Sequence, residues 1–546
     1  MTDLEQLAEL IFPDVKETVE DLEKRYPPRN LEEGAIVARF APSPTGFLHT
    51  GSLFATLIAW RFPNQTNGVF FTRLEDTDTK REIEGSGEEL LKQLEAFGIT
   101  PNEGYMGSYE LGNYGPYKQS NREMIYRIVI KEFVKRNLAY PCFCSSEELS
   151  KMRNFQEENK LNPGYYGEFA KCSKLSPKEA IAKIKNNEPY VIRFRSHGNY
   201  QNKIKITDLI RGNLELAQND QHIVILKSDG LPTYHFAHLV DDHFMRTTHV
   251  TRGEEWLPSL PIHYELFDAI GWKKPNYAHL PVIMKLDNGS RRKLSKRKDP
   301  EASVSFFLEN GYPVEGILEY LVTIANSNFE EWLDNNPNSS LDEFKFDFKK
   351  ISASGTLFDV EKLLNISKNY ISLLTASEVY DKTLEYSKHY DKELYDLLNK
   401  YKEYSIAVMN IERQQKKPRK DMAMFSDYKK ENWYMYDELF DNFEYQFDKI
   451  TDKAEIKKIL DLYISKYYDV SDKETWFNKI KMLSEELGYA KEVREYKDNP
   501  DKYPGHVGDV SMVLRVVLTS KTMTPDLYEI MCLLGKNRIE KRFNMF

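Results

Sequence analysis

Cysteine is scarce in this chain, and long apolar runs are missing. Only four cysteines occur among 546 residues, which excludes a disulfide-stapled scaffold and suits a reducing compartment. The most apolar stretches, such as residues 317–325, are interrupted by Glu, Tyr or Thr. None approaches the roughly 18 residues that a membrane span needs. The first 26 residues are acidic and lack the basic start and small-residue cleavage site of a signal peptide. We therefore expect a cytoplasmic protein that does not enter membranes.

Low complexity and a strong charge bias are absent as well. Glycine and proline number 26 and 24, far below the level of collagen-like or disordered chains. Hydrophobic residues make up 41% and charged residues 29% of the chain, which is typical of globular proteins. At roughly 100–200 residues a domain, the length predicts about three to five domains. The net charge of −9 argues against wholesale coating of nucleic acid but permits a local basic site.

The first part of the chain predicts a helical extension followed by a parallel α/β domain. Apolar positions recur at helical spacing over 4–26 and stop at two prolines. Then come an apolar strand at 35–40, a Pro/Gly-rich turn at 41–46, a helix at 52–61 and a second strand at 68–74. Sites in such sheets lie at the carboxyl ends of the strands, where the turn and an acidic run fall.

The composition of the rest of the chain changes several times. A Lys/Glu-rich stretch at 142–172 holds three of the four cysteines and predicts an insertion, with strands returning at 190–195 and 222–226. Residues 326–341 are rich in Asn and Ser and predict a loop. From about residue 359 helical spacing dominates, which predicts an all-helical C-terminal half.

The turn after the first strand is the first candidate site. It reads Arg39-Phe-Ala-Pro-Ser-Pro-Thr-Gly-Phe-Leu-His-Thr-Gly-Ser52, so that His49 and Gly51 open the next helix. A helix N-terminus attracts phosphate, and a histidine there can donate to it. Gly51 allows a ligand to approach the backbone closely. Taken alone, H-x-G also fits an ordinary strand–helix turn with a capping serine.

An acidic block ends the second strand, Arg73-Leu-Glu-Asp-Thr-Asp-Thr-Lys-Arg81. Three carboxylates in four positions would be costly to bury unpaired. The block is either a solvated acidic turn or a site that grips ammonium groups and hydroxyls.

A basic run, Arg291-Arg-Lys-Leu-Ser-Lys-Arg-Lys298, lies far downstream. Lysine side chains are point charges that can stabilise phosphate groups. A solvated charged face is the alternative.

Between these motifs lies a stretch dense in aromatic, His, Arg and acidic residues, Gly230–His243 followed by Thr248–Trp256. Buried tyrosines and histidines need hydrogen-bond partners. Such a density is more than a plain core requires.

Together the four strings resemble the signatures of class I aminoacyl-tRNA synthetases, in the form found in glutamyl-tRNA synthetases. The first resembles the HIGH signature, with Ser52 at its variable fourth position. The basic run, taken as Lys293-Leu-Ser-Lys-Arg297, resembles the KMSKS loop. The acidic block and the aromatic stretch resemble two further blocks of the same enzymes. The resemblance covers 35–546 and leaves the first 34 residues without a functional account.

The resemblance implies where each substrate binds. Catalytic roles fall to His49, Gly51, Lys293 and Lys296. ATP, with Mg²⁺, would be held by Pro44, Thr45, Gly46, His49, Gly51, Ser52, Glu255, Leu294, Ser295 and Lys296. Glutamate would be held by Arg39, Ala41, Ser43, Glu75, Tyr234, His238, Arg252 and Trp256. Glu75 would take the α-amino group, and His238 stands where bacterial glutamyl enzymes usually have Asn.

Glutamate also fits the residues on physical grounds. A γ-carboxylate in a sheltered pocket needs a fixed cation, and arginine offers a bidentate fork. Arg39 and Arg252 are the candidates, and the family resemblance favours Arg39. The implied reaction has two steps: the amino-acid carboxylate attacks the α-phosphate of ATP, and a terminal ribose hydroxyl of tRNA then attacks the acyl group. Positioning and charge stabilisation suffice for both.

The insertion carries Cys142-Phe-Cys144, a Pro-Gly-Tyr-Tyr-Gly segment and Cys172. Two cysteines one residue apart plus a third can form a thiolate zinc corner. Some bacterial glutamyl enzymes bind zinc here with a tyrosine, which Tyr165 resembles by its context. Two alternatives are therefore open. Either these three cysteines and Tyr165 hold a structural Zn²⁺, or the cysteines are three free thiols.

The resemblance implies an α/β fold: a class I Rossmann-type catalytic domain with an inserted acceptor-binding subdomain, then a stem-contact region and an all-α anticodon-binding half. The expected boundaries are 1–34 for a helical extension, 35–140 and 228–285 for the two halves of the catalytic domain, 141–227 for the insertion, 286–370 for the stem-contact region with the KLSKR loop, and 371–546 for the anticodon-binding domain. The expected partners are tRNA(Glu), L-glutamate and ATP, with the protein working as a monomer.

A basic patch stands out in the acidic C-terminal half, within 409–424. Its members are Arg413, Lys416, Lys417, Arg419 and Lys420. These side chains either bind the phosphates of a nucleic acid or form a solvated helix face.

Three other functions compete with glutamate–tRNA ligation. Glutaminyl-tRNA synthetases carry β-barrels where this chain predicts helices. The short paralogue that glutamylates a modified tRNA base has no anticodon-binding half. A catalytically silent RNA-binding protein need not retain His49, Gly51, Lys293 and Lys296.

Overall fold

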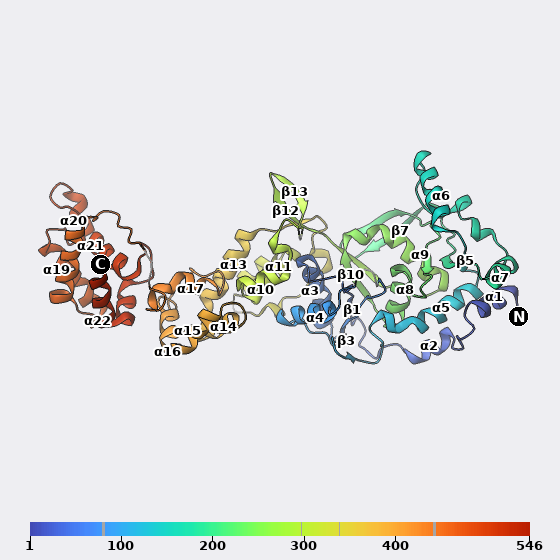
Figure 1. Cartoon of the computed structure of the whole chain (residues 1–546), viewed down its shortest axis with the longest axis horizontal. Coiled ribbons are helices and arrows are strands. Elements are labelled where there is room, and N and C mark those ends of the chain that lie inside the picture. Colours follow the sequence, from blue (N-terminus) through green and yellow to red (C-terminus); the bar gives the residue numbers. More distant parts are fainter. Residues whose placement is uncertain (79–81, 296, 338, 441–443) are drawn as a thin grey trace. The chain divides into compact units, whose positions relative to one another are not determined.

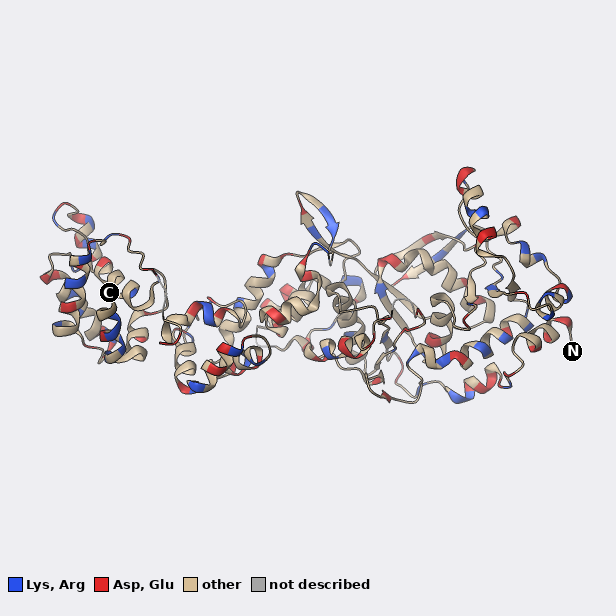
Figure 2. Cartoon of the chain, in the orientation of Figure 1, with Lys and Arg blue, Asp and Glu red and all other residues tan. Residues whose placement is uncertain are grey.

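The computed structural model divides into two compact units (Figure 1). It describes residues 1–78, 82–295, 297–337, 339–440 and 444–546. Unit 1 comprises 1–306 and 321–359, and unit 2 comprises 307–320 and 360–546. The chain therefore passes from one unit to the other three times. Lys and Arg are interspersed with Asp and Glu over both units (Figure 2). Among the described residues, no helix is both long and apolar enough to cross a bilayer.

A β–α–β crossover follows the N-terminal extension in unit 1. β1 (Val37–Phe40) leads through the proline-rich turn into α3 (Thr50–Gln65), which returns the chain to β2 (Val69–Thr72). β2 is parallel both to β1 and to β3 (Glu103–Tyr105). The strands are short and apolar because parallel sheets are covered on both faces. The expected strand, turn, helix and strand are confirmed, with ends shifted by a few residues.

A second parallel set continues the sheet region. β10 (His249–Gly253) is parallel to β11 (Asn276–Leu280), and β11 is parallel to β7 (Lys203–Asp208). The amide of Thr248 donates to the carbonyl of Val37 at 2.9 Å, so β10 lies beside β1. The carboxyl ends of β1, β2, β10 and β11 consequently meet at one edge, as in other α/β folds that bind ligands there.

The insertion has its own sheet. β5 (Ala139–Cys142) is antiparallel to β6 (Val191–Phe194), which is antiparallel to β9 (Val224–Leu226). Helices α6 (Ser146–Glu158) and α7 (Pro177–Lys185) lie in the chain between β5 and β6. The strands expected at 190–195 and 222–226 are confirmed.

The N-terminal extension is two helices rather than one. α1 (Asp3–Ile11) ends before Pro13, because proline lacks the amide that would continue the helix. α2 (Val19–Arg25) starts from a capping box at Thr18. Apolar residues of both helices join the core around α5 (Glu123–Lys135). The extension is thus part of the unit 1 core.

The predicted loop at 326–341 contains a helix, α12 (Phe329–Asn335). Phe329 is buried and packs against Phe344, with ring centroids 5.0 Å apart, and against Trp332. Burial of these rings outweighs the weak helix propensity of the Asn-rich stretch, which was the basis of the wrong prediction.

The described residues of unit 2 form helices joined by loops, with no β-strand among them, as predicted. Its helices after residue 359 are α13 (Val360–Leu373), α14 (Ala376–Tyr390), α15 (Lys392–Lys400), α16 (Lys402–Asn410), α17 (Asp427–Asn432), α18 (Lys453–Leu462), α19 (Lys473–Glu486), α20 (Val493–Asp498), α21 (Val507–Thr519) and α22 (Leu527–Met545). Residues 307–320 belong to the same unit. The amide of Phe425 donates to the carbonyl of Gly311 at 2.7 Å, and Lys382 pairs with Glu315 at 2.7 Å.

The basic patch at 409–424 is not a helix face, because α16 ends at Asn410 and α17 begins at Asp427. Arg413 is buried and donates to the carbonyls of Met409 and Ile371, at 2.8 and 2.6 Å. The Arg413 side chain thus fastens the end of α16 to the end of α13 within unit 2.

Candidate active site

A cleft of about 790 Å³ opens where the parallel strands of unit 1 end. Its walls come from the ends of β1 and β10, the residues after β2 and β11, and the start of α3. It gathers twelve of the residues singled out from the sequence: Arg39, Ala41, Ser43, His49, Gly51, Ser52, Glu75, Tyr234, Arg252, Glu255, Trp256 and Lys293. The cleft thus lies at the edge where the strand order predicts a ligand.

The other described residues of the predicted sites lie outside the lining of this cleft: Pro44, Thr45, Gly46, His238, Leu294 and Ser295. Leu294 is buried, and the amide of Ser295 donates to the Asp299 carboxylate at 2.8 Å. Lys296 lies outside the described residues. The binding roles of all these side chains stay predictions.

His49 caps the N-terminus of α3. Its Nδ1 accepts the amide hydrogen of Gly51 at 2.9 Å. Because Nδ1 accepts, the proton of the neutral imidazole is on Nε2, which is then the donor. A Cβ at position 51 would come within 3.2 Å of Nδ1, so a larger residue there would press on the cap. The helix start and Nε2–H together form an anion-binding corner.

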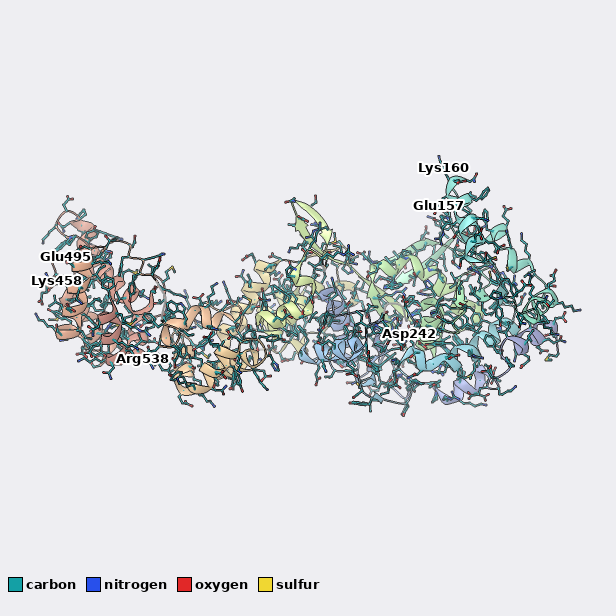
Figure 3. All side chains as sticks on the ribbon, viewed as in Figure 1. Glu157, Lys160, Asp242, Lys458, Glu495 and Arg538 are labelled. Carbon is teal, nitrogen blue, oxygen red and sulfur yellow. The ribbon has the colours of Figure 1, made fainter. Side chains whose placement is uncertain are left out.

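A buried network of charges supports the other wall. Arg73 is fully buried and donates to Asp242 at 2.7 Å and to Glu75 at 2.9 Å. Arg39 approaches the same Asp242 carboxylate through Nε at 3.4 Å. Burial opposes the charge of Asp242, but Arg73 and Arg39 outweigh it and hold its pKa well below the usual range. Figure 3 labels Asp242, inside unit 1. The network fixes Arg39 and Glu75 at the cleft.

The comparisons with known proteins decide the family. The model of "tRNA synthetases class I (E and Q), catalytic domain" matches residues 35–365, more than half of the chain. The chain belongs to this family. An "Anticodon binding domain" model matches 505–546, inside helical unit 2.

Relatives of this synthetase extend the match to the full chain. The glutamate–tRNA ligase of Clostridium perfringens (strain SM101 / Type A) is 47% identical over 546 residues, covering 99% of each chain. That of Acetivibrio thermocellus is 46% identical, also covering 99% of each. A crystal structure of a glutamate tRNA ligase from Elizabethkingia meningosepticum, in complex with its amino acid, has a TM-score of 0.75 and 27% identity and covers 94% of this chain and 99% of that one.

The loop with the KMSKS-like string of the synthetase is anchored at its base. It follows a hairpin of β12 (Ile283–Asp287) and β13 (Ser290–Lys293). Asp299 accepts two hydrogen bonds from Arg292, at 2.6 and 2.7 Å, and one from the amide of Ser295. Sequence analysis missed Asp299, although it directly follows the basic run. Its carboxylate fixes the ends of the loop while Lys293 stays exposed at the cleft.

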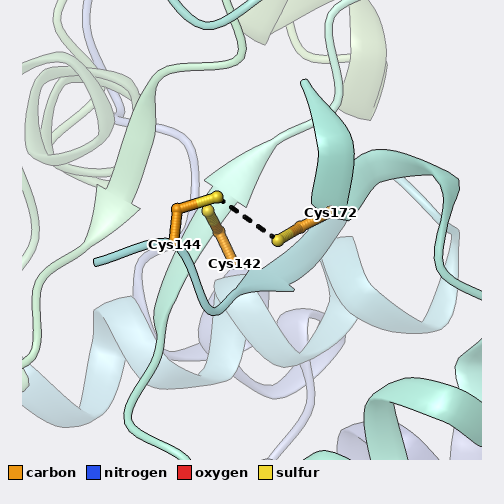
Figure 4. A group of neighbouring side chains, drawn as sticks. All are labelled: Cys142, Cys144 and Cys172. Atoms are coloured by element: carbon orange, nitrogen blue, oxygen red, sulfur yellow. Dashed lines mark hydrogen bonds between the residues drawn. The ribbon is translucent and has the colours of Figure 1, made fainter. Parts of the chain in front are cut away.

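The three cysteines of the insertion lie together (Figure 4), and the Tyr165 hydroxyl lies beside two of them. Sγ of Cys144 is 3.6 Å from Sγ of Cys172 and 3.3 Å from the Tyr165 hydroxyl. Sγ of Cys142 is 3.5 Å from the same hydroxyl. The hydrogen bond with Cys172 lowers the pKa of Cys142 to about 4. The structure therefore brings all four predicted ligands into one cluster.

Two buried histidines, His238 and His263, and the partly buried His235 form a group near the cleft. His238 has Nδ1 2.7 Å from the Asp242 carboxylate and Nε2 2.9 Å from the Tyr277 hydroxyl, so it lies beneath the cleft wall. Nδ1 of His235 is 3.0 Å from Nε2 of His263. Burial lowers the pKa of His235 and His238 to about 4 each, and that of His263 well below its usual value. All three are neutral in the folded protein at neutral pH.

We expect the free energy of unfolding to fall as the pH drops from about 6.5 to about 4. In that window the unfolded chain binds protons at these histidines and the folded chain does not. For His235 and His238, both states are neutral above 6.5 and both are protonated below about 4, so the contribution of these two residues to the slope vanishes on both sides. Each histidine adds at most about 1.4 kcal/mol per pH unit.

Urea titrations between pH 4.5 and 7.5 measure this slope. His238→Asn should reduce it, whereas the same change at exposed His389 should not. An equal slope in wild type and His238→Asn contradicts the prediction.

Proposed function

We propose that this glutamate–tRNA ligase forms glutamyl-adenylate from L-glutamate and ATP in the unit 1 cleft and then transfers glutamate to the 3′ end of tRNA(Glu). The observation that carries the proposal is the gathering of the signature residues in one cleft, in a chain 47% identical over its full length to a glutamate–tRNA ligase. ATP is used with Mg²⁺, which offsets phosphate charge.

Each side of the cleft suits one part of the reaction. The positive end of the α3 dipole and the His49 imidazole at the start of that helix suit the phosphates of ATP. Arg39 and Arg252 offer cations to glutamate carboxylates, and Glu75 offers an anion to its ammonium group. When the glutamate carboxylate attacks the α-phosphate, charge develops beside His49 and pyrophosphate leaves towards Lys293. No protein nucleophile is needed.

The remaining parts suit tRNA. We assign the insertion, 141–227, to the acceptor end, 286–370 to the stem, and 371–546 to the anticodon, in a protein that works as a monomer. The match of an anticodon-binding model to 505–546 supports the last assignment.

Pyrophosphate exchange in the presence of tRNA tests the function. The enzyme should catalyse exchange that depends on glutamate, ATP and tRNA(Glu), and should charge tRNA(Glu) with glutamate. Exchange with glutamine but not glutamate would indicate the glutaminyl alternative. Charging of tRNA(Gln) is measured side by side with purified isoacceptors.

We further propose that the cysteine cluster holds a structural zinc ion. Ligands at about 2.3 Å in a tetrahedron lie about 3.8 Å from one another. Three pairs of donor atoms here are 3.3 to 3.6 Å apart, and the three sulfurs all lie within 4.8 Å of one another. The Arg193 guanidinium lies 4.1 Å over the Tyr165 ring and stabilises negative charge on the cluster. Zinc would fix the loop between β5 and α6 to the segment around Cys172.

Purified protein should therefore contain about one zinc per chain. Cys142→Ser should release the metal and destabilise the insertion. Cys532→Ser, at the exposed fourth cysteine in unit 2, is the matched control and should keep the metal. Metal analysis after growth in zinc-replete medium distinguishes the two alternatives, because a zinc content far below one per chain indicates three free thiols.

A further inference from the structure

Among the residues that the structure describes, every hydrogen-bond partner of the Arg252 guanidinium at the cleft is neutral. Its Nε donates to Nε2 of His279 at 2.9 Å. Its Nη1 donates to the Tyr234 hydroxyl at 3.3 Å and to Nδ1 of His263 at 3.2 Å. Nη2 makes the longest bond, 3.5 Å to the carbonyl of Trp256. The guanidinium is thus held by hydrogen bonds that leave its charge uncompensated.

The buried Arg73 shows the contrast. Its guanidinium contacts the carboxylates of Asp242 and Glu75 directly, at 2.7 and 2.9 Å. Direct pairing of that kind satisfies a buried cation but leaves little charge for a ligand. Arg252 reaches a carboxylate only through an imidazole.

That carboxylate is Asp208, at the end of β7. Its Oδ2 accepts from Nδ1 of His279 at 2.7 Å. The Asp208 carboxylate is itself fixed by the amides of Ile210 and Arg211, at 3.0 and 2.9 Å. Both Asp208 and His279 are buried. The relay Asp208–His279–Arg252 is therefore rigid at its far end.

The relay also fixes the state of the imidazole. Nε2 of His279 accepts from Arg252, so it carries no proton, and Nδ1 carries the proton donated to Asp208. A protonated imidazole would point a hydrogen at the hydrogen of Arg252 Nε. Burial lowers the pKa of His279, which agrees with a neutral ring.

We propose that His279 and Asp208 are positioning residues that orient the Arg252 guanidinium toward the side-chain carboxylate of glutamate without neutralising it. A carboxylate in direct contact with Arg252 would compete with the substrate, and no acceptor at all would leave the guanidinium free to rotate. The neutral imidazole neither competes with the substrate nor leaves the guanidinium free to rotate. The inference rests on the proposed function, because it assumes that glutamate occupies the cleft.

Two isosteric changes at one position separate this role from packing. The amide of glutamine reaches the place of Nε2, so His279→Gln keeps an acceptor for Arg252 and loses the donor to Asp208. The amide of asparagine takes the place of Nδ1, so His279→Asn keeps the donor and loses the acceptor. His279→Asn should raise the glutamate KM about 10-fold or more, with the ATP KM unchanged and kcat within about 3-fold. His279→Gln should raise the glutamate KM much less.

Asp208→Asn tests the far end of the relay and keeps the imidazole, so it carries the test should His279→Asn not fold. It should raise the glutamate KM about 3-fold or more, again without changing the ATP KM. His222→Asn is the control for loss of a buried histidine, because His222 bonds the Tyr140 hydroxyl inside the insertion. It should leave both KM values unchanged.

Glutamate-dependent pyrophosphate exchange, with melting curves of each variant, gives the readout. Equal glutamate KM values in His279→Asn and His279→Gln, or an unchanged KM in Asp208→Asn, overturn the positioning role. A wild-type enzyme without glutamate-dependent exchange refutes the proposed function instead, so the two failures are distinct.

Discussion

Replacing His49 with alanine should lower the rate of adenylate formation by about 100-fold or more, with little change in glutamate binding. In the proposed function His49 donates through Nε2–H to the phosphate on which charge develops, and the Nδ1 bond to Gly51 fixes the orientation of the ring. Removing one preorganised donor to developing charge typically costs about 10²–10³ in kcat. The loss falls on the transition state, so KM changes less than kcat. Single-turnover formation of adenylate measures the step directly.

The chain offers a matched control for this variant. His506 begins α21 of unit 2 with the same H-x-G arrangement, and its Nδ1 accepts the amide hydrogen of Gly508 at 3.0 Å. His506→Ala removes the same kind of cap, worth about 1 kcal/mol, but does not touch the cleft. Near-wild-type turnover in His49→Ala, or an equal loss of adenylation in His506→Ala, would refute the assignment. From the sequence, Lys296→Ala is predicted to have an effect as large as His49→Ala.

The second large effect concerns the choice of amino acid. Arg39→Ala should raise the glutamate KM about 30-fold or more, with less effect on ATP, because truncating one partner of a sheltered ion pair costs about 2–5 kcal/mol. Glutamate and glutamine differ only in a carboxylate against an amide, so charge must separate them. Arg39 lines the cleft at the end of β1 and is held by Asp242. Rejection of glutamine should weaken with the loss of Arg39.

Two parallel variants make this measurement decisive. Arg136→Ala removes an arginine that donates to the carbonyls of Ala269 and Ile270 and does not line the cleft, so it should leave both KM values unchanged. Arg252→Ala tests whether that residue alone holds the γ-carboxylate. If Arg39→Ala keeps both its glutamate KM and its rejection of glutamine, Arg39 is structural and the role passes to Arg252.

The parts of the site that could be predicted are local in sequence. The turn and the start of α3 lie within a few residues of one another, and their geometry follows from proline, glycine and the need of a helix start to satisfy its amides. The carboxyl-end position of the cleft follows from strand–helix alternation alone. These features depend on neighbours along the chain, which a sequence displays.

Apart from Asp299, the parts that were missed depend on distant residues. Asp208 and His279 are 71 positions apart and meet only because β7 lies beside β11. A histidine inside the apolar strand Asn276–Leu280 was the available signal, since a buried imidazole needs partners. The helix at Phe329 was missed for the same reason, because its stability comes from packing against Phe344 rather than from its own propensities.

The chain crosses between its two units three times, and this affects how one unit can be expressed without the other. A truncated gene that starts at residue 360 would omit 307–320, although the described contacts tie that segment to unit 2. The hydroxyl of Ser426 donates to the carbonyl of Asn310 at 2.6 Å, and the amide of Phe425 to that of Gly311. A free-standing tRNA-binding half should therefore be encoded as 307–320 joined by a short linker to 360–546, with the intervening segment left to the catalytic fragment.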